Sequence, residues 1–568
     1  MHRIGKRSTD VVQYDALSNT IIMQKFLAFA FITLYLCAGC SKEKSNPSPT
    51  NNPTFKISQI LINEEQLTAQ HKDVNLNARI QITFESSITE QGLQTHLELL
   101  DADRVKIPVQ TQVAADKKTV TLLPSASLKP LSSYTLIIRN TLLSTDNRKL
   151  DKEYSYMLTT TIDLSDKHER ISSEALLTKI QQQTFKYFWD HAHPAYGMIR
   201  ERNTSNETVT IGGTGFGIMA IIVGAERGFI SRTDGLNRIK KIVSFLKIAD
   251  TYHGAFSHWY NGNTAKTLPF SEKDNGADLV ETSLLFQGLL TAREYFDDAE
   301  LQKDITTLYE TIEWDFFRNG QSTLYWHWSP NYAWELNLPI TGWNESLITY
   351  VLAAGSKDNS IAAAVYEQGW AKSGAMRNGK SYYGISLPLG PENGGPLFLS
   401  QYSFLGLNPF GLQDQYASYE EQVKNHSLIN RAYCIANPKN FAGYSENCWG
   451  LTASDDINGY MAHSPTNDNG VISPTAALSS MPYTPKESMQ ALEFFYYKLG
   501  DKIWGEYGFK DAFSLSEPWF ADSYLAIDQG PIIIGIENHR TGLLWKYFMQ
   551  APEIKKALQT LKFTSPNI

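Results

Sequence analysis

The chain has 568 residues, of which 42% are hydrophobic and 19% are charged, so it is long enough to bury more than one core. Its formal net charge is -8 and it contains no long basic tract, which argues against a nucleic-acid partner. All 12 tryptophans lie at or beyond Trp189, so the first third and the remainder are expected to be different kinds of domain.

Within the expected signal segment 1–39, the residues from Met23 onward are typical of a secretion signal. Lys25 precedes an apolar run over 26–36, which is too short to span a bilayer as a helix. Residues 1–22 have no signal character, so we expect translation to start at Met23.

The small residues before Cys40 resemble a bacterial lipobox, although Cys37 occupies the position where Leu is commoner. This predicts cleavage before Cys40, lipidation of its thiol, and a flexible tether over 40–54 that is rich in Asn, Pro and Ser. The protein is therefore expected to be an outer-membrane lipoprotein of the cell envelope, which contacts the membrane only through the lipid on Cys40.

Residues 55–163 alternate apolar and polar side chains as half-buried strands do. The segments 55–60, 78–84, 119–124 and 134–138 show this alternation, with turn residues at regular spacing. Several short strands within about 100 residues predict an all-β Ig-like sandwich. Its order resembles bacterial Ig-like domains, including the Leu-x-Pro-Leu-x-x-Tyr step at 128–134.

From about residue 170 the apolar period changes to that of helices. Helices are expected over 175–191, 217–227, 236–251, 278–296, 301–318, 344–354, 487–499, 531–536 and 541–549. Long loops rich in Trp, Tyr, Gly and Pro separate them, and such loops usually carry function. The pattern over 170–560 suggests an all-α (α/α)6 toroid whose loops gather at one mouth. The glycines of Gly213-Thr214-Gly215-Phe216-Gly217 are expected to let a helix pack close to a neighbour.

Three carboxylates stand at helical spacing before an apolar segment. Asp274, Asp278 and Glu281 are at i, i+4 and i+7, so one helix face could carry all three. The apolar run over 284–290 indicates a buried helix, and buried carboxylates need a compensating partner or a proton. Asp278 and Glu281 also fit a helix cap, an alternative that leaves the third acid unexplained. The cluster therefore favours acid–base chemistry.

The loops carry aromatic and polar side chains suited to a sugar, whose apolar faces stack on indoles. Any single tryptophan can instead fill a core, but the set as a whole favours a carbohydrate cleft. The candidates for substrate binding are Trp259, Trp326, Trp328, Trp343, Trp449, Asp455, Asp528 and Gln529. His191-x-His193 and the Asp455–Asp456 pair could bind a metal but lack a complete ligand set, so we expect no metal site.

Cys434 and Cys448 would be the remaining cysteines of the mature chain besides Cys40. In an oxidising envelope they could form a disulfide, and two free buried thiols are the alternative. Neither lies in a recognisable nucleophile context, so catalysis by cysteine is not expected.

Five motifs occur in the order found in a known family. The chain resembles the bacterial glycoamylase-like proteins of glycoside hydrolase family 144, whose characterised members act on β-1,2-glucan. The motifs are Thr214-Gly-Phe-Gly, Asp274-x-x-x-Asp278-x-x-Glu281, Gly342-Trp343-Asn344-Glu345, Trp449-Gly-Leu-Thr-Ala-Ser-Asp455 and Asp528-Gln-Gly-Pro…Glu537-Asn538. The resemblance implies an (α/α)6 barrel and hydrolysis of β-1,2-glucosidic bonds with inversion and without a cofactor.

The resemblance places the site acids at Asp274, Asp278, Glu281 and Glu345. Inversion needs one protonated acid and one carboxylate that activates water, about 6.5–9.5 Å apart. The general acid is expected to be Glu281 or Glu345, with an aspartate orienting water or sugar. The expected products are sophorose and short sophorooligosaccharides from a monomeric enzyme. The alternatives are an exo-acting, sophorose-releasing or other β-glucan hydrolase, and a non-catalytic surface glycan-binding lipoprotein.

Overall fold

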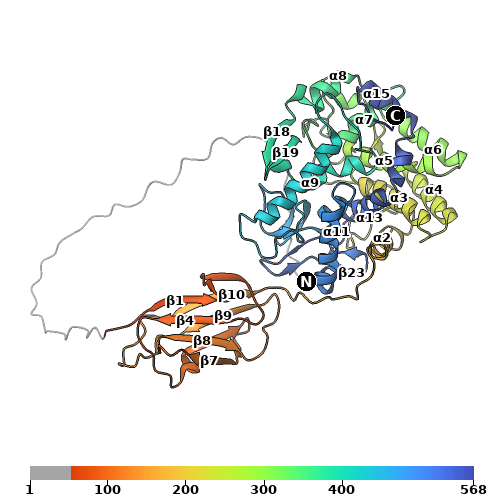
Figure 1. Cartoon of the computed structure of the whole chain (residues 1–568). Coiled ribbons are helices and arrows are strands. Elements are labelled where there is room, and N and C mark those ends of the chain that lie inside the picture. Colours follow the sequence, from red (N-terminus) through yellow and green to blue (C-terminus); the bar gives the residue numbers. More distant parts are fainter. Residues whose placement is uncertain (1–52, 568) are drawn as a thin grey trace, which may run out of the picture.

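The computed structural model describes residues 53–567, which form two domains joined by a short linker (Figure 1). The predicted signal segment, the start at Met23 and the lipidated Cys40 lie outside the described residues, as does most of the tether. Within residues 53–567, none of the helices combines the length and the apolar character that crossing a bilayer would require.

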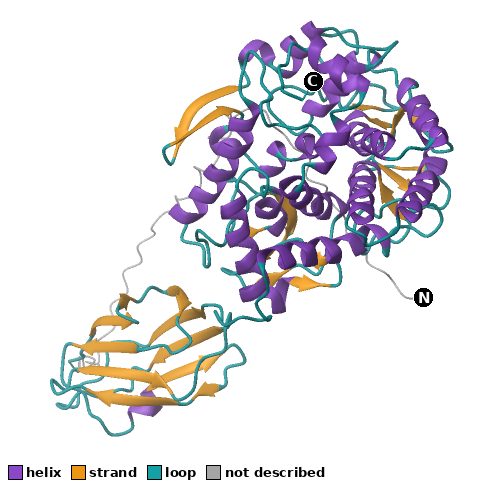
Figure 2. Cartoon of the chain, turned by 45° about the vertical axis from the view of Figure 1, so that its right-hand side comes forward, coloured by secondary structure: helices purple, strands orange, loops and turns teal. Residues whose placement is uncertain are grey.

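The first domain is the predicted β-sandwich, drawn in orange strands in Figure 2. One sheet has the order β2-β1-β4-β8-β7, formed by Glu65–Gln66, Ile57–Ile62, Ile80–Phe84, Thr119–Pro124 and Val109–Val113. The other has the order β3-β10-β9-β5-β6, formed by Gln70–Val74, Tyr154–Thr160, Ser133–Ile138, Leu97–Asp101 and Lys106–Ile107. A short helix α1 (Leu93–His96) precedes β5. Ile80, Ile82 and Phe84 of β4 are buried while the residues between them are not, which confirms the predicted alternation.

The Leu-x-Pro-Leu-x-x-Tyr segment at 128–134 stabilises the β-sandwich through its tyrosine. Tyr134 is buried, and its hydroxyl accepts a hydrogen bond from the Lys129 N–H at 2.9 Å. The linker that follows is tied to the second domain, because Lys167 N–H donates to the Tyr497 carbonyl at 2.6 Å and Lys498 Nζ to the Leu164 carbonyl at 2.7 Å.

The second domain is built from successive outer and inner helical segments. The outer segments are α2 (Ser173–Trp189), α4 (Arg232–Leu246), α6 (Ala299–Glu310), α8 (Ala363–Val365) with η2 (Tyr366–Trp370), α9 (Tyr419–Ala436), and α11 (Pro485–Glu493) with η7 (Phe494–Lys498) and α12 (Leu499–Ile503). The inner segments are α3 (Ile211–Glu226), α5 (Leu279–Tyr295), α7 (Leu347–Gly355), η5 (Leu397–Ser400) with η6 (Tyr402–Leu405), α10 (Pro474–Ser479) and α13 (Ala526–Arg540). α14 (Leu543–Phe548) and α15 (Pro552–Thr560) complete the domain.

The inner helices are buried almost all round, whereas the outer ones bury one face. Every residue of α7 is buried, but α6 buries only Leu301, Ile305 and Tyr309. The ring is also linked by polar contacts, since Gln401 Nε2 donates to the Ala476 carbonyl of α10 at 2.9 Å. The arrangement confirms the predicted (α/α)6 toroid, with short 3-10 turns in place of its fourth inner helix.

α3 and α5 touch through their backbones. A Cβ atom added at Gly215 would lie 2.2 Å from the Leu284 carbonyl oxygen, and one added at Gly288 would lie 2.2 Å from the Gly215 carbonyl oxygen. This close approach confirms the expected role of the glycines. α3 starts at Ile211, earlier than predicted, because these glycines belong to the helix itself.

Other boundaries also differ from the sequence-based expectation. The helix expected from residue 344 starts at Leu347, because Asn344 Oδ1 accepts from the Ser346 N–H at 2.9 Å and forms a turn there. The sequence analysis did not predict α9, α10 or α15. Cys434 and Cys448 are buried free thiols, which settles the two alternatives for the cysteines against a disulfide.

Candidate active site

The long loops between outer and inner helices lie at one end of the toroid, where the inner helices start. Asp278 is the N-cap of α5: its Oδ1 accepts from the N–H groups of Val280 and Glu281 at 3.0 and 2.9 Å. Its Oδ2 lies 3.1 Å from His258 Nδ1. Asp278 therefore caps the helix, as one of the two interpretations expected. It also belongs to the cluster of acids, because its second oxygen faces His258.

Glu281 is held between the starts of two inner helices. Its Oε2 accepts from the Gly212 N–H in the first turn of α3 at 2.7 Å, and its Oε1 lies 3.9 Å from His258 Nε2. A Cβ at residue 212 would lie 2.6 Å from Oε2, so any larger residue there would push the carboxylate out of this position. Burial raises the pKa of Glu281, while the charge of His258 lowers it.

His258 supplies the positive charge of this group. Burial lowers its pKa, but the carboxylates of Glu281, Asp278 and Asp274 outweigh that effect and raise it to about 10. The imidazole is therefore protonated at neutral pH and neutralises part of the acid cluster. A single loop histidine carries no spacing signal, which is why the sequence analysis missed it.

Asp274 lies beside the same group and not on the helix. Its Oδ1 is 3.1 Å from Nε2 of His327, whose strand pairs with the strand of Asp278. His258, Asp274 and Asp278 could each offer one metal ligand, with ligand atoms within 4.8 Å of one another. A protonated imidazole cannot be a ligand, so a metal would have to displace the proton that the acids hold on His258.

Glu345 comes from a different segment, directly before α7. Its backbone carbonyl accepts from the Ser403 hydroxyl, which joins the turn to η6. Burial, together with the charges of Asp278 and Glu281, raises the pKa of Glu345 to about 7. Near neutral pH, Glu345 is thus the carboxyl group of this cluster that is suited to carry a proton.

A second group of acids lies at the start of α13. Asp511 and Asp528 are buried near each other, and burial together with the charge of Asp511 raises the pKa of Asp528 well above its usual value. Burial and the charge of Asp455 raise the pKa of Asp511 to about 7. The Asp455 carboxylate accepts hydrogen bonds from two residues. Arg202 Nη1 lies 3.2 Å from each of its oxygens, and the Ser523 hydroxyl donates to Oδ2. The sequence analysis predicted Asp455 and Asp528 here and missed Asp511 and Arg202.

The two groups of acids flank the start of α3. Gly212 contacts Glu281 on one side, and a Cβ at Gly213 would lie 2.6 Å from the Cβ of Ala526, the first residue of α13, on the other. Tyr402 lies between the groups: burial raises its pKa well above the usual value, and the charges of Asp528, Glu345 and Asp511 raise it further. One mouth therefore holds both groups.

Of the five predicted tryptophans, three are only partly buried and two are enclosed in the core. Trp259 stacks edge-on against His258, with ring centroids 5.5 Å apart, and the Trp326 carbonyl accepts from the Leu279 N–H at the start of α5 at 2.8 Å. Trp328 packs against His253 and Phe316, on the side of its strand away from His327.

Three of the residues predicted to contact substrate are buried in this structure. Trp449 is fully buried in the core, and Trp343 is enclosed by aromatic rings, with only 6% of its surface exposed. Gln529 is also buried, and its Nε2 donates to the Phe509 carbonyl at 2.8 Å. For the two tryptophans, this is the core position that the sequence analysis gave as the alternative for any single tryptophan.

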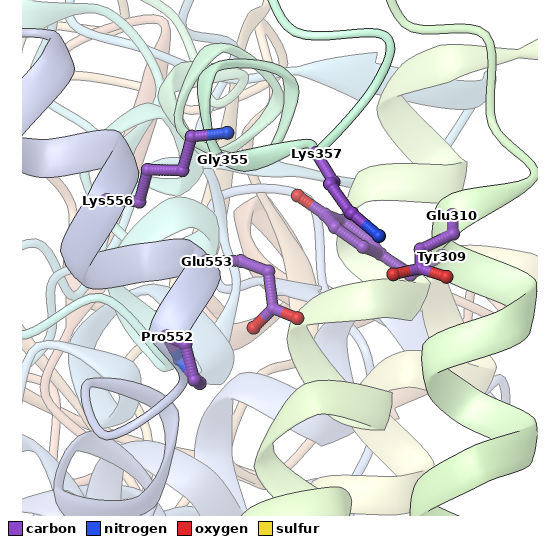
Figure 3. Close-up of a pocket in the computed structure, with 7 residues that line it drawn as sticks. All are labelled: Tyr309, Glu310, Gly355, Lys357, Pro552, Glu553 and Lys556. Carbon is purple, nitrogen blue, oxygen red and sulfur yellow. The ribbon is translucent and has the colours of Figure 1, made fainter.

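A separate concavity of about 210 Å³ lies at the other end of the toroid (Figure 3). It is lined by Tyr309, Glu310, Gly355, Lys357, Pro552, Glu553 and Lys556. Gly355 ends the nine-residue helix α7 that Glu345 precedes, so about 13 Å of helix separates them. Glu553 is already paired with Arg293 at 2.6 Å. This concavity is therefore not part of the site.

Comparisons with known proteins agree with this geometry. A family model described as "Putative glucoamylase" matches residues 337–552, and a bacterial Ig-like domain model matches residues 62–161. The chain is 52% identical to the solved endo-β-1,2-glucanase of Chitinophaga pinensis, with 70% of this chain and all of that chain covered and a TM-score of 0.69. It is 36% identical to the solved β-1,2-glucanase of Parabacteroides distasonis, with 90% and 74% covered and a TM-score of 0.67.

A curated relative from Parabacteroides distasonis is named an exo β-1,2-glucooligosaccharide sophorohydrolase acting at the non-reducing end. It is 44% identical over 420 residues, which are 69% of this chain. The matched part spans only 58% of the length of that relative.

Proposed function

The chain belongs to the glycoamylase-like family of glycoside hydrolases, family 144, and we propose that it hydrolyses the β-1,2-glucosidic bonds of β-1,2-glucan. The observation that carries this proposal is a buried carboxyl group, Glu345, whose pKa is raised by burial and by the charges of Asp278 and Glu281, while His258 contacts both of those carboxylates. A protein that only binds glycans does not need a carboxyl group with a raised pKa, such as Glu345. It also does not need the carboxylates of Asp278 and Glu281 beside a protonated His258.

In the proposed mechanism, Glu345 is the general acid and protonates the leaving glucosidic oxygen. Glu281 is the general base, because its Oε2 is anchored by the Gly212 N–H while its Oε1 lies 3.9 Å from His258 Nε2, beyond hydrogen-bond distance. Asp278 caps α5 and orients His258, and Asp274 holds water or sugar beside them. Water attacks the anomeric carbon, Glu281 takes a proton from it, and the bond to the leaving oxygen breaks with inversion.

The purified full chain is expected to convert linear β-1,2-glucan into sophorose and short sophorooligosaccharides, which chromatography over time resolves. The first product formed should be the α-anomer, because inversion of a β-bond gives it, and proton NMR during the first minutes would record it. Laminarin, starch and β-1,4-glucans serve as control substrates. If every one of these polysaccharides stayed intact, the non-catalytic glycan-binding function would replace this proposal.

A second candidate activity is exo-hydrolysis that releases sophorose from chain ends. The name of the curated relative favours it, whereas the name of the Chitinophaga pinensis relative favours internal cleavage. A ladder of oligosaccharides at early times would support internal cleavage, and sophorose as the sole early product would support exo-hydrolysis. We also propose, from the sequence alone, that the lipid on Cys40 holds the enzyme at the outer membrane.

Replacing His258 by Gln is expected to move the acidic limb of the pH–activity profile upward by about one unit. The imidazolium lowers the pKa of Glu281, so its loss lets the base take up a proton at a higher pH. Initial rates from pH 4 to 9 measure this shift. His253→Gln is the control, because His253 lies in the same loop but pairs with Glu313 at 2.8 Å. An acidic limb that stays in place in His258→Gln would contradict the assignment of Glu281.

A further inference from the structure

The hairpin β20–β21 stands at the mouth beside the second group of acids. β20 (Ala453–Asp456) pairs antiparallel with β21 (Gly459–Ala462), and Asp455 lies directly opposite Tyr460. Directly opposed residues of antiparallel strands project from the same face. Tyr460 therefore shares the face of Asp455, whereas Asp456 projects from the other face and accepts from Asn469 Nδ2 at 2.6 Å.

The shared face is turned toward the start of α13. Asp455 bonds to Arg202 and Ser523 on that side, and the Ala526 N–H at the first turn of α13 donates to the carbonyl of Glu201 at 2.9 Å. This face therefore combines a carboxylate, a guanidinium and the buried Asp511–Asp528 pair. Such an array suits the ring of hydroxyl groups of a sugar.

Tyr460 adds an aromatic surface to this polar array. It is 46% exposed. Burial raises the pKa of Tyr402, and Tyr460 is among the groups that raise it further, together with Asp528 and Glu345. A partly exposed ring on the same hairpin face as a hydrogen-bonded carboxylate offers both the apolar surface and the polar groups that one glucose unit requires.

We propose that Tyr460 is a stacking platform for a glucose unit of the chain, whose hydroxyls bond to Asp455 and Arg202, on the far side of the α3 start from Glu345 and Glu281. This proposal rests on the proposed function and adds a subsite to it. The subsite binds a sugar away from the cleaved bond, so its contribution is to the affinity for longer chains and not to the chemical step.

Tyr460→Ala is expected to raise KM for β-1,2-glucan about tenfold, or about 1.4 kcal/mol, and to leave kcat within about twofold. Tyr460→Phe keeps the ring face and should stay near wild type. Ile457→Ala is the matched control, because Ile457 is an exposed apolar residue of the same hairpin, 38% exposed. Calorimetric titration of β-1,2-glucan into the Glu345→Gln and Glu345→Gln/Tyr460→Ala chains should show the same loss of affinity without turnover.

An unchanged KM and affinity in Tyr460→Ala, with an active wild-type chain, would overturn the subsite alone. A loss as large in Ile457→Ala as in Tyr460→Ala would also overturn it, because the hairpin and not the ring would then be responsible. If the wild-type chain released no products from β-1,2-glucan, that result would contradict both the proposed function and the subsite. Thermal midpoints of the variants confirm that each is folded.

Discussion

Glu345→Gln is expected to lower kcat on β-1,2-glucan by roughly 10³-fold, because the amide cannot give a proton to the leaving oxygen. KM should change little, since the side chain keeps its size and its place before α7. The matched control is Glu310→Gln, an exposed carboxylate of α6 beside the concavity at the opposite end of the toroid. Steady-state kinetics on all three chains measure the difference.

Two further readouts separate proton donation from a structural effect of Glu345→Gln. A sophorose glycoside with a nitrophenol leaving group needs no proton, so the variant should recover much of its activity on it. The wild-type rate on β-1,2-glucan should fall as pH rises through about 7, where Glu345 loses its proton, and this basic limb should vanish in the variant. Equal losses on both substrates would contradict the role of general acid.

Gly215→Ala is expected to destabilise the second domain by about 3 kcal/mol or more. The added methyl group would meet the Leu284 carbonyl oxygen and the Leu285 Cα, and backbone atoms cannot turn away as a flexible side chain can. Because α3 carries Gly212 and α5 carries Glu281, separating the two helices should also lower activity. Urea unfolding followed by circular dichroism, with parallel kinetics, measures both effects.

Gly235→Ala is the control for this substitution. Gly235 lies in the outer helix α4, where a Cβ would be 3.5 Å from its nearest neighbours, an ordinary contact. Alanine has the higher helix propensity, so this variant should be as stable as wild type or more stable, by up to about 1 kcal/mol. If Gly215→Ala were equally harmless, the proposed backbone contact between α3 and α5 would be wrong.

The sequence by itself determined the architecture, because the apolar period is a local property of the chain. The alternation in β4 and the all-round apolar character of α5 predicted a half-buried strand and a buried inner helix, and both are present. The sequence also placed Asp274, Asp278 and Glu281 close together, although only Glu281 lies within α5, since Asp278 caps that helix and Asp274 precedes it. Short elements such as α10, with six residues, carry too few periods to be detected.

Only the tertiary structure decided how the acids differ from one another. The charge of His258, the Gly212 N–H on Glu281 and the burial of Glu345 come from segments far apart in the chain, so no local pattern encodes them. The same holds for the aromatic residues, since Trp259 lies at the mouth while Trp449 fills the core. Burial and neighbouring charge set a pKa and an exposed face, and both depend on which distant segments the fold brings together.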